Sequence, residues 1–131
     1  MFWAQLALGT LGAALLFWLG WDAMAPRASD AVAQHELGRK VYNFRCYYCH
    51  GYSGDAKTLA ASFLSPPPRD FTAGAPLDAA HIAQAVTDGR PGTAMASFRD
   101  VIPHDEIAAV AAFVAREFVR DRAPNTAYHT A

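Results

Sequence analysis

Several common functional signatures are missing from this sequence. It has no glycine-rich phosphate loop, no arrangement of serine, histidine and aspartate suited to nucleophilic catalysis, no internal repeat and no basic stripe. Its 11 lysine and arginine residues are balanced by 12 aspartate and glutamate residues, which gives a formal net charge of −1. We therefore expect no nucleic-acid partner and no single strong electrostatic field that steers partners. No stretch alternates long enough between apolar and polar residues to predict a strand, so the expected fold class is all-α.

Cysteine is scarce, and its scarcity limits the possible metal sites. The chain has two cysteines, Cys46 and Cys49, so a zinc site with four thiolates is impossible. A site with two thiolates and two imidazoles needs closely spaced histidines, and His81 and His104 lie far apart. A thiol redox motif normally follows a strand, whereas a helix is predicted before Cys46. Redox, metal-binding and disulfide roles for the two thiols remain as alternatives.

The two cysteines and the next residue form the motif C-x-x-C-H, in the run Cys46-Tyr47-Tyr48-Cys49-His50. This spacing is typical of covalent attachment of a c-type haem. The two thiols add across the two vinyl groups of the porphyrin, and the histidine is held beneath the iron as the proximal ligand. The sequence therefore predicts one covalent haem c, bound by Cys46, Cys49 and His50, and electron transfer without enzymatic activity.

Methionine is also rare, and one methionine occupies a position suited to the sixth iron ligand. Met95 is the only methionine after residue 25, and it lies in the glycine- and proline-containing run 89–98. Such a run predicts a loop that can present a thioether to the iron. Filling of the core is the other common role of methionine. His81 is the main competitor, although it falls in an amphipathic helical pattern; the other histidines are read as surface or packing residues: His35, His104 and His129.

Apolar periodicity predicts three main helices. The first covers residues 30–45 with Ser29 or Asp30 as its cap, and the second covers Leu77–Asp88 and ends at Gly89. The third, of about four turns, carries an apolar stripe from Ile107 to Phe118. A core made by three helices is small, and a covalently held apolar macrocycle would give them a large flat surface to bury.

The N-terminal segment lacks charge over a long run. Residues 2–21 contain no charged side chain, and tryptophans stand near both ends of the run. A helix of twenty residues spans ~30 Å, about the hydrocarbon thickness of a bilayer. We therefore expect a transmembrane anchor at 1–21, a linker at 22–30, a haem domain at 31–122 and a flexible tail at 123–131. A cleaved signal peptide ending at Ala23-Met24-Ala25 is the alternative, although the run is long and no lysine or arginine precedes it.

From about Glu36 to Phe118 the chain resembles a class I monohaem cytochrome c. The resemblance rests on the pattern Gly38-x-x-x-Tyr42-x-x-x-Cys46-x-x-Cys49-His50, the post-haem turn 51–55, the proline-bearing loop 66–72 and the last helix at 105–114. It implies that Gly38 and Tyr42 meet Val110 and Phe113, and that the proline-bearing loop steadies His50. One departure is Ala96, because a proline often follows the axial methionine in this family.

The resemblance implies a cytochrome c fold with three main helices around one haem, and the uncharged run at 2–21 predicts a single N-terminal transmembrane helix before it. Within the family the chain resembles the small carriers and cytochrome subunits of bacterial respiratory oxidases and reductases, so we expect a one-electron relay between respiratory or photosynthetic complexes. Haem attachment occurs in the bacterial periplasm, which places the haem domain outside an inner-membrane anchor. The alternatives are a fixed subunit of a larger membrane oxidoreductase and a haem enzyme or sensor with a labile Met95. Three arginines are candidates for the haem edge or for solvated surface: Arg69, Arg90 and Arg99.

Overall fold

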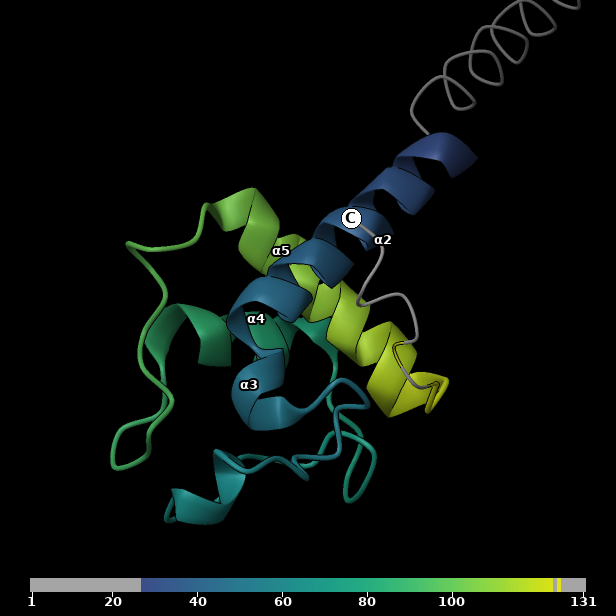
Figure 1. The fold of residues 1–131 in the computed structure, drawn as a ribbon. Helices are drawn as coiled ribbons and strands as arrows, with labels where there is room; N and C mark the ends of the chain where they lie inside the picture. Colours follow the sequence, from purple (N-terminus) through teal and green to yellow (C-terminus); the bar gives the residue numbers. More distant parts are fainter. Residues whose placement is uncertain (1–26, 124, 126–131) are drawn as a thin grey trace, which may run out of the picture. The chain divides into compact units, whose positions relative to one another are not determined.

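The computed structural model describes residues 27–123 and Asn125. Within this part of the chain the secondary structure is entirely helical, as Figure 1 shows, which confirms the predicted all-α class. The elements are α2 (Ala28–Arg45), α3 (Tyr47–His50), η1 (Ala61–Phe63), α4 (Ala79–Asp88), α5 (His104–Val114) and the π-helical segment η2 (Ala115–Arg120).

The predicted anchor at 1–21 lies outside the described residues, as do the first residues of the linker and most of the predicted tail. Among the helices that the structure describes, none is long and apolar enough to cross a bilayer. The site described below is formed by residues of the second of the two units into which the chain divides, residues 32–131.

Two helix starts differ from the sequence prediction. Helix α2 begins at Ala28, ahead of the expected start, and the Asp30 carboxylate accepts a hydrogen bond from the backbone N–H of Arg27 at 3.3 Å. Asp30 therefore lies inside the first turn, where a carboxylate favours the positive end of the helix dipole. Helix α4 begins at Ala79 instead of Leu77, because Asp78 is its cap and accepts from the backbone N–H of His81 at 2.8 Å.

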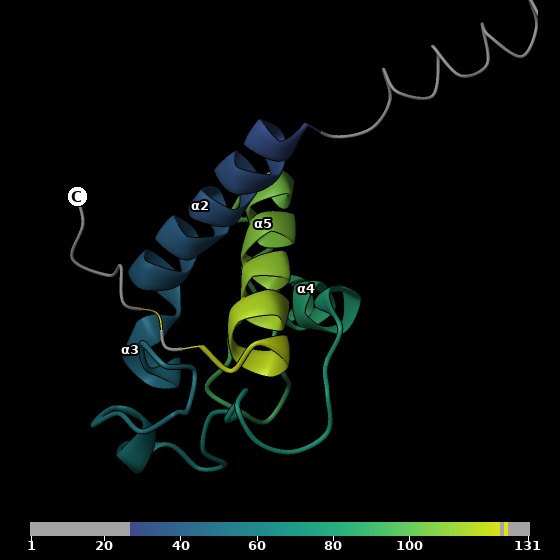
Figure 2. The ribbon, with the colours of Figure 1, turned by 90° about the vertical axis from the view of Figure 1, so that its right-hand side faces the viewer.

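Helices α2 and α5 cross closely at a glycine (Figure 2). A Cβ placed on Gly38 would overlap the backbone carbonyl of Ala109 and lie 2.8 Å from the Cβ of Phe113. The Tyr42 ring lies 5.6 Å from the Phe113 ring, centroid to centroid. The expected meeting of Gly38 and Tyr42 with Phe113 is thus confirmed, while the backbone next to Gly38 belongs to Ala109 and not to Val110.

The core next to this crossing is an aromatic cluster. Tyr42, Phe113 and Phe118 are fully buried, and the Tyr42 and Phe118 ring centroids are 5.0 Å apart. The Tyr42 hydroxyl donates a hydrogen bond to the backbone oxygen of Gly51 at 2.7 Å. Burial raises the pKa of Tyr42, which keeps this donor protonated. The aromatic cluster therefore ties the end of α3 to the helix crossing.

Candidate functional site

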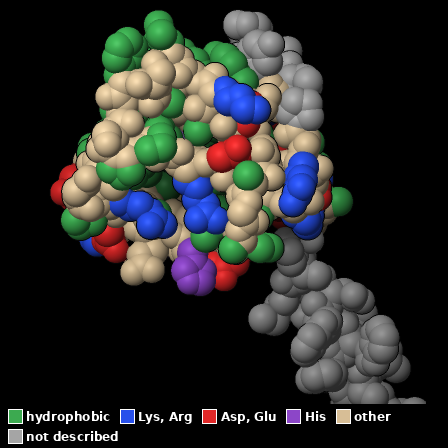
Figure 3. Space-filling view, turned by 90° about the horizontal axis from the view of Figure 1, so that it is seen from below, with side chains coloured by type: hydrophobic (Ala, Val, Ile, Leu, Met, Phe, Trp, Pro, Cys, Tyr) green, Lys and Arg blue, Asp and Glu red, His purple; other side chains and the backbone are tan. Residues whose placement is uncertain are grey.

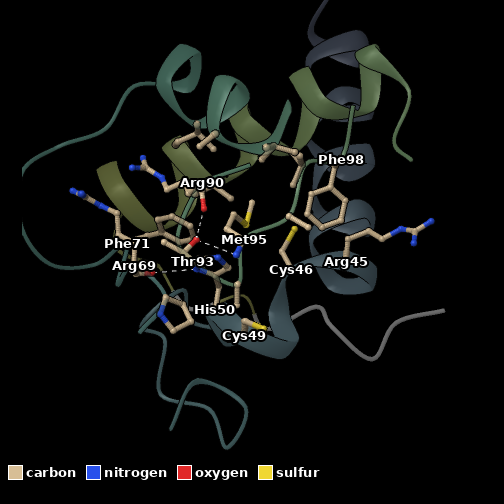
Figure 4. A pocket seen from close by; sticks show the side chains of 18 of the residues that line it. Arg45, Cys46, Cys49, His50, Arg69, Phe71, Arg90, Thr93, Met95 and Phe98 are labelled. Atoms are coloured by element: carbon tan, nitrogen blue, oxygen red, sulfur yellow. Dashed lines mark hydrogen bonds between the residues drawn. The ribbon is translucent and has the colours of Figure 1, made fainter. Parts of the chain in front are cut away.

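All four residues predicted to bind the cofactor line one cavity. Its volume is about 430 Å³, and Cys46, Cys49, His50 and Met95 all face it (Figure 4). Helix α4 packs against α5 behind the cavity. Most of the lining is apolar and comes from both helices and from the loops: Leu64, Phe71, Leu77, Ile82, Val86, Phe98, Val110 and Val114. Two thiols, an imidazole, a thioether and apolar walls are what a covalently attached haem requires, so the residues present fit this group.

A tight helical path brings the two thiols and the imidazole together. The Cys46 N–H donates to the Tyr42 carbonyl at 2.9 Å, and the His50 N–H donates to the Cys46 carbonyl at 3.0 Å. Cys46 and His50 therefore lie one turn apart on the same side of the helical path, with Cys49 beside His50. The C-x-x-C-H spacing thus directs its three reactive side chains to one cavity.

The environment of Cys46 does not favour a redox role. Burial, with a contribution from Cys49, raises the pKa of Cys46 to about 12. Redox-active cysteines need the opposite shift, because the thiolate is the nucleophile. Within residues 27–123 and Asn125, no group of three or more His, Cys, Asp or Glu side chains is arranged to hold a metal ion.

His50 is oriented by the proline-bearing loop. Its Nδ1 lies 3.2 Å from the backbone oxygen of Arg69, so Nδ1–H can donate to this carbonyl and Nε2 is left for a metal. The ring also stacks on Phe71 with a centroid distance of 4.6 Å. Burial lowers the pKa of His50, which favours the neutral imidazole that can bind a metal. These contacts confirm that the loop 66–72 steadies His50.

The segment that follows Met95 is tied to the end of α4. The Phe98 N–H donates to the Val86 carbonyl at 3.0 Å, and the Ser97 hydroxyl donates to the Thr87 carbonyl at 2.6 Å. Gly89 has a φ of +71°, and a Cβ placed on it would lie 2.7 Å from the backbone nitrogen of Ser97. The chain after Met95 is thus held against α4 although Ala96 provides no proline ring.

Of the other histidines that the structure describes, His81 lines the cavity, whereas His35 and His104 do not. His81 lies at the start of α4 and lines the cavity, and its Nδ1 is 2.8 Å from the Asp78 carboxylate. His35 instead pairs with Glu117 at 2.8 Å and joins α2 to η2. His104 is the first residue of α5 and does not line the cavity, and His129 lies outside the described residues.

The arginines divide into those that line the cavity and those that do not. Of the three candidates for the haem edge, Arg69 and Arg90 line the cavity, whereas Arg99 does not and pairs with Asp88. Sequence reasoning missed Arg45, whose guanidinium carbon lies 4.8 Å from the centre of the exposed Phe44 ring. In the view of Figure 4, Arg69 and Arg90 lie on one side and Arg45 on the other, beside Cys46. None of the arginines that line the cavity forms an ion pair with a carboxylate of the described residues.

The charges on the surface are mixed. Seen from below, basic, acidic and apolar side chains are interspersed on the face shown in Figure 3 and do not separate into one charged patch. This agrees with the nearly balanced composition of the whole chain. Long-range steering by one strong field is therefore not a property of this face.

Comparisons with known proteins assign a family to the region that contains the cavity. A family model described as "Cytochrome C oxidase, cbb3-type, subunit III" matches residues 33–114. A solved structure of a reducing HAO-like protein complex from Kuenenia stuttgartiensis is similar, with a TM-score of 0.55 and 27% sequence identity over 60% of this chain. The match covers 40% of that structure's chain, so our chain corresponds to less than half of it. No curated protein matches the sequence.

Proposed function

Because this chain belongs to the family described as cytochrome c oxidase, cbb3-type, subunit III, and is a small c-type cytochrome, we propose that it relays single electrons through one covalently bound haem c. The observation that carries this proposal is the convergence of Cys46, Cys49, His50 and Met95 on one apolar cavity. The match to the family supports haem-based electron transfer, and the convergence of these side chains supports the proposed ligand set.

Each of these side chains has a separate task. The thiols of Cys46 and Cys49 form the covalent links, which hold the cofactor permanently at the end of α2 and at α3. His50 binds through Nε2 because its Nδ1 is directed to the Arg69 carbonyl. Met95 would provide a thioether as the second protein ligand of the iron. When bound, the haem supplies an iron that alternates between the ferrous and ferric states.

The two arginines on one side of the cavity suit the propionates of a haem. Arg69 and Arg90 lie on one side in the view of Figure 4, and Cys46 lies toward the other. In a haem bound through Cys46 and Cys49, these guanidinium groups would be available to hold the propionate carboxylates. Guanidinium groups bind carboxylates well because their donors match the two oxygens.

The proposed ligand set favours electron transfer over catalysis. If His50 and Met95 both hold the iron, it would have no open position for oxygen or substrate, and the group would supply one-electron transfer instead of bond chemistry. A methionine ligand raises the reduction potential. We therefore assign the protein to the high-potential part of a respiratory or photosynthetic chain.

A fixed subunit of a larger membrane oxidoreductase is the second candidate. The printed description of the family is that of an oxidase subunit, and the similar structure comes from a protein complex. Gly9, Gly12 and Gly20 would permit close approach of other helices to the N-terminal segment. In this case the haem would pass electrons within a permanent assembly, and the donor would be a neighbouring subunit.

We assign the protein to the bacterial inner membrane as a single-pass protein. Residues 2–21 are uncharged and long enough to span the hydrocarbon core, and Trp3, Trp18 and Trp21 would lie near its two interfaces. Because haem attachment in bacteria takes place in the periplasm, the haem domain belongs on that side. The anchor would confine the carrier to two dimensions and raise its effective concentration near membrane partners.

Membrane extraction tests the location in the membrane, and native electrophoresis separates the free carrier from the fixed subunit. After an alkaline carbonate wash, the haem-stained protein should stay in the membrane pellet. A soluble haem protein whose N-terminus lies near Pro26 would show instead a periplasmic shuttle with a cleaved signal peptide. Native electrophoresis of mildly solubilised membranes should then show a small haem band for a free carrier, and a band of high mass for a fixed subunit.

A further inference from the structure

The loop that carries Met95 is a closed turn. The Arg90 N–H donates to the Met95 carbonyl at 2.8 Å, which joins the two ends of the segment 90–95. Inside it, the Thr93 N–H donates to the Arg90 carbonyl at 3.1 Å, and Gly92 has a φ of +77°. Proline at the second position and a left-handed glycine at the third are the signature of a type II turn, here formed by Arg90–Thr93.

One side chain links this turn to the backbone of Met95. The Thr93 hydroxyl donates to the Arg90 carbonyl at 2.8 Å and accepts from the Met95 N–H at 3.1 Å. A hydroxyl can donate and accept at once, which neither a methyl group nor an ammonium group can do. Thr93 thus connects the start of the turn to the residue that the turn presents.

Thr93 restrains the backbone around Met95, where the residue after Met95, Ala96, does not. Ala96 does not restrict the backbone as a proline would, and Ala94, Thr93 and Gly92 are all exposed to solvent. A rotation of the backbone between Thr93 and Ala96 would move Met95 away from the cavity. Such a rotation would break the hydrogen bond from the Met95 N–H to the Thr93 hydroxyl.

We propose that Thr93 is a positioning residue that holds Met95 over the cavity and slows its release from the haem iron. The proposal rests on the proposed ligation of the iron by Met95 and adds a residue that controls the lifetime of that bond. Thr93 acts through the Met95 backbone, because its one O–H donor is used by the Arg90 carbonyl and its oxygen accepts from the Met95 N–H. Release of the thioether is the step that would open the iron to other ligands.

The test compares Thr93→Val with Thr93→Ser. Valine keeps the shape of threonine and removes the hydroxyl, whereas serine keeps the hydroxyl and removes the methyl group. Ser62→Ala is the matched control, because the Ser62 hydroxyl donates to the Leu59 carbonyl at 2.7 Å across the same sequence separation and Ser62 does not line the cavity. The probe is imidazole, which replaces the methionine in the ferric haem-loaded protein at a rate that is limited by methionine release when imidazole is saturating.

Thr93→Val should bind imidazole about three- to tenfold faster than the wild type at saturating imidazole, since one hydrogen bond no longer opposes release. Its ferric absorption band from methionine ligation, near the red edge of the visible spectrum, should also disappear at a lower temperature. Thr93→Ser and Ser62→Ala should both stay within about twofold of the wild type.

Two results would overturn the proposal without affecting the assignment of Met95 as a ligand. The first is a wild-type rate in Thr93→Val, and the second is the same acceleration in Thr93→Ser as in Thr93→Val. A wild-type ferric protein without the methionine band would instead reject the ligand assignment, and the role of Thr93 with it. The band and the imidazole rate together therefore distinguish the two failures.

Discussion

Replacement of both cysteines, Cys46→Ser with Cys49→Ser, should abolish the haem that stays with the polypeptide on a denaturing gel. Each thiol supplies one of two covalent links, and a hydroxyl does not replace a thiol in this addition. Each single variant keeps only one of the two links, so its haem retention should be weakened or abolished. Both sulfurs face the same cavity, so the loss of either leaves the other still able to react.

The measurement is haem staining by peroxidase activity, normalised to the amount of polypeptide on an immunoblot. Tyr48→Phe is the matched control, because Tyr48 lies between the cysteines and its side chain is exposed. This control should stain like the wild type. Wild-type staining in both single variants and in the double variant would show that the thiols do not attach the cofactor.

Met95→Ala should lose the red-edge absorption band of the ferric protein and lower its reduction potential. A thioether stabilises the ferrous iron, and its removal leaves a site for water. The expected decrease is on the order of 0.1 to 0.2 V, a fraction of the range of ~0.8 V over which axial ligands set haem potentials. The reduced variant should also bind carbon monoxide, which the wild type should not bind readily.

The comparison variant is His81→Ala, because His81 is the histidine of α4 that lines the same cavity. In this variant the band and the potential should stay unchanged, since the ring of His81 is held by Asp78 at the cavity's edge. An unchanged spectrum in Met95→Ala together with an altered one in His81→Ala would mean ligation by two histidines. The working potential would then be lower than we propose.

The helices and the site motif were predictable because their signals are local. A period of 3.6 residues in the apolar positions located α2, α4 and α5 to within a few residues, and Gly89 correctly marked the end of α4. The motif at Cys46 to His50 needs no tertiary information, since the helical path itself directs these side chains to one side. The helix starts were predicted less exactly. Ser29 and Asp30 both suit a cap for α2, which begins at Ala28. Helix α4 was expected to begin at Leu77, whereas Asp78 is its cap.

The remaining features depend on packing between distant segments. The contact of Gly38 with Ala109, rather than with Val110, depends on how α5 is rotated about its axis, and the sequence pattern allowed either position. The place of Arg45 at the cavity depends on where α2 ends relative to α4. The hydrogen bonds of Thr93 follow from the shape of a turn whose sequence indicated only a loop. The loop that steadies His50 was expected from the sequence, whereas the role of Thr93 beside Met95 was found in the structure.

The most direct test of the central claim is a pyridine haemochrome spectrum, with a reduced-minus-oxidised spectrum, of the full-length protein purified from membranes. We expect one haem per chain, with the band positions of a haem whose two vinyl groups are both saturated by thioether links. A haemochrome with unsaturated vinyl groups would contradict this expectation, because the cofactor would then not be attached through Cys46 and Cys49. A protein without haem that contains a stoichiometric metal or a disulfide would reject the electron-transfer function altogether.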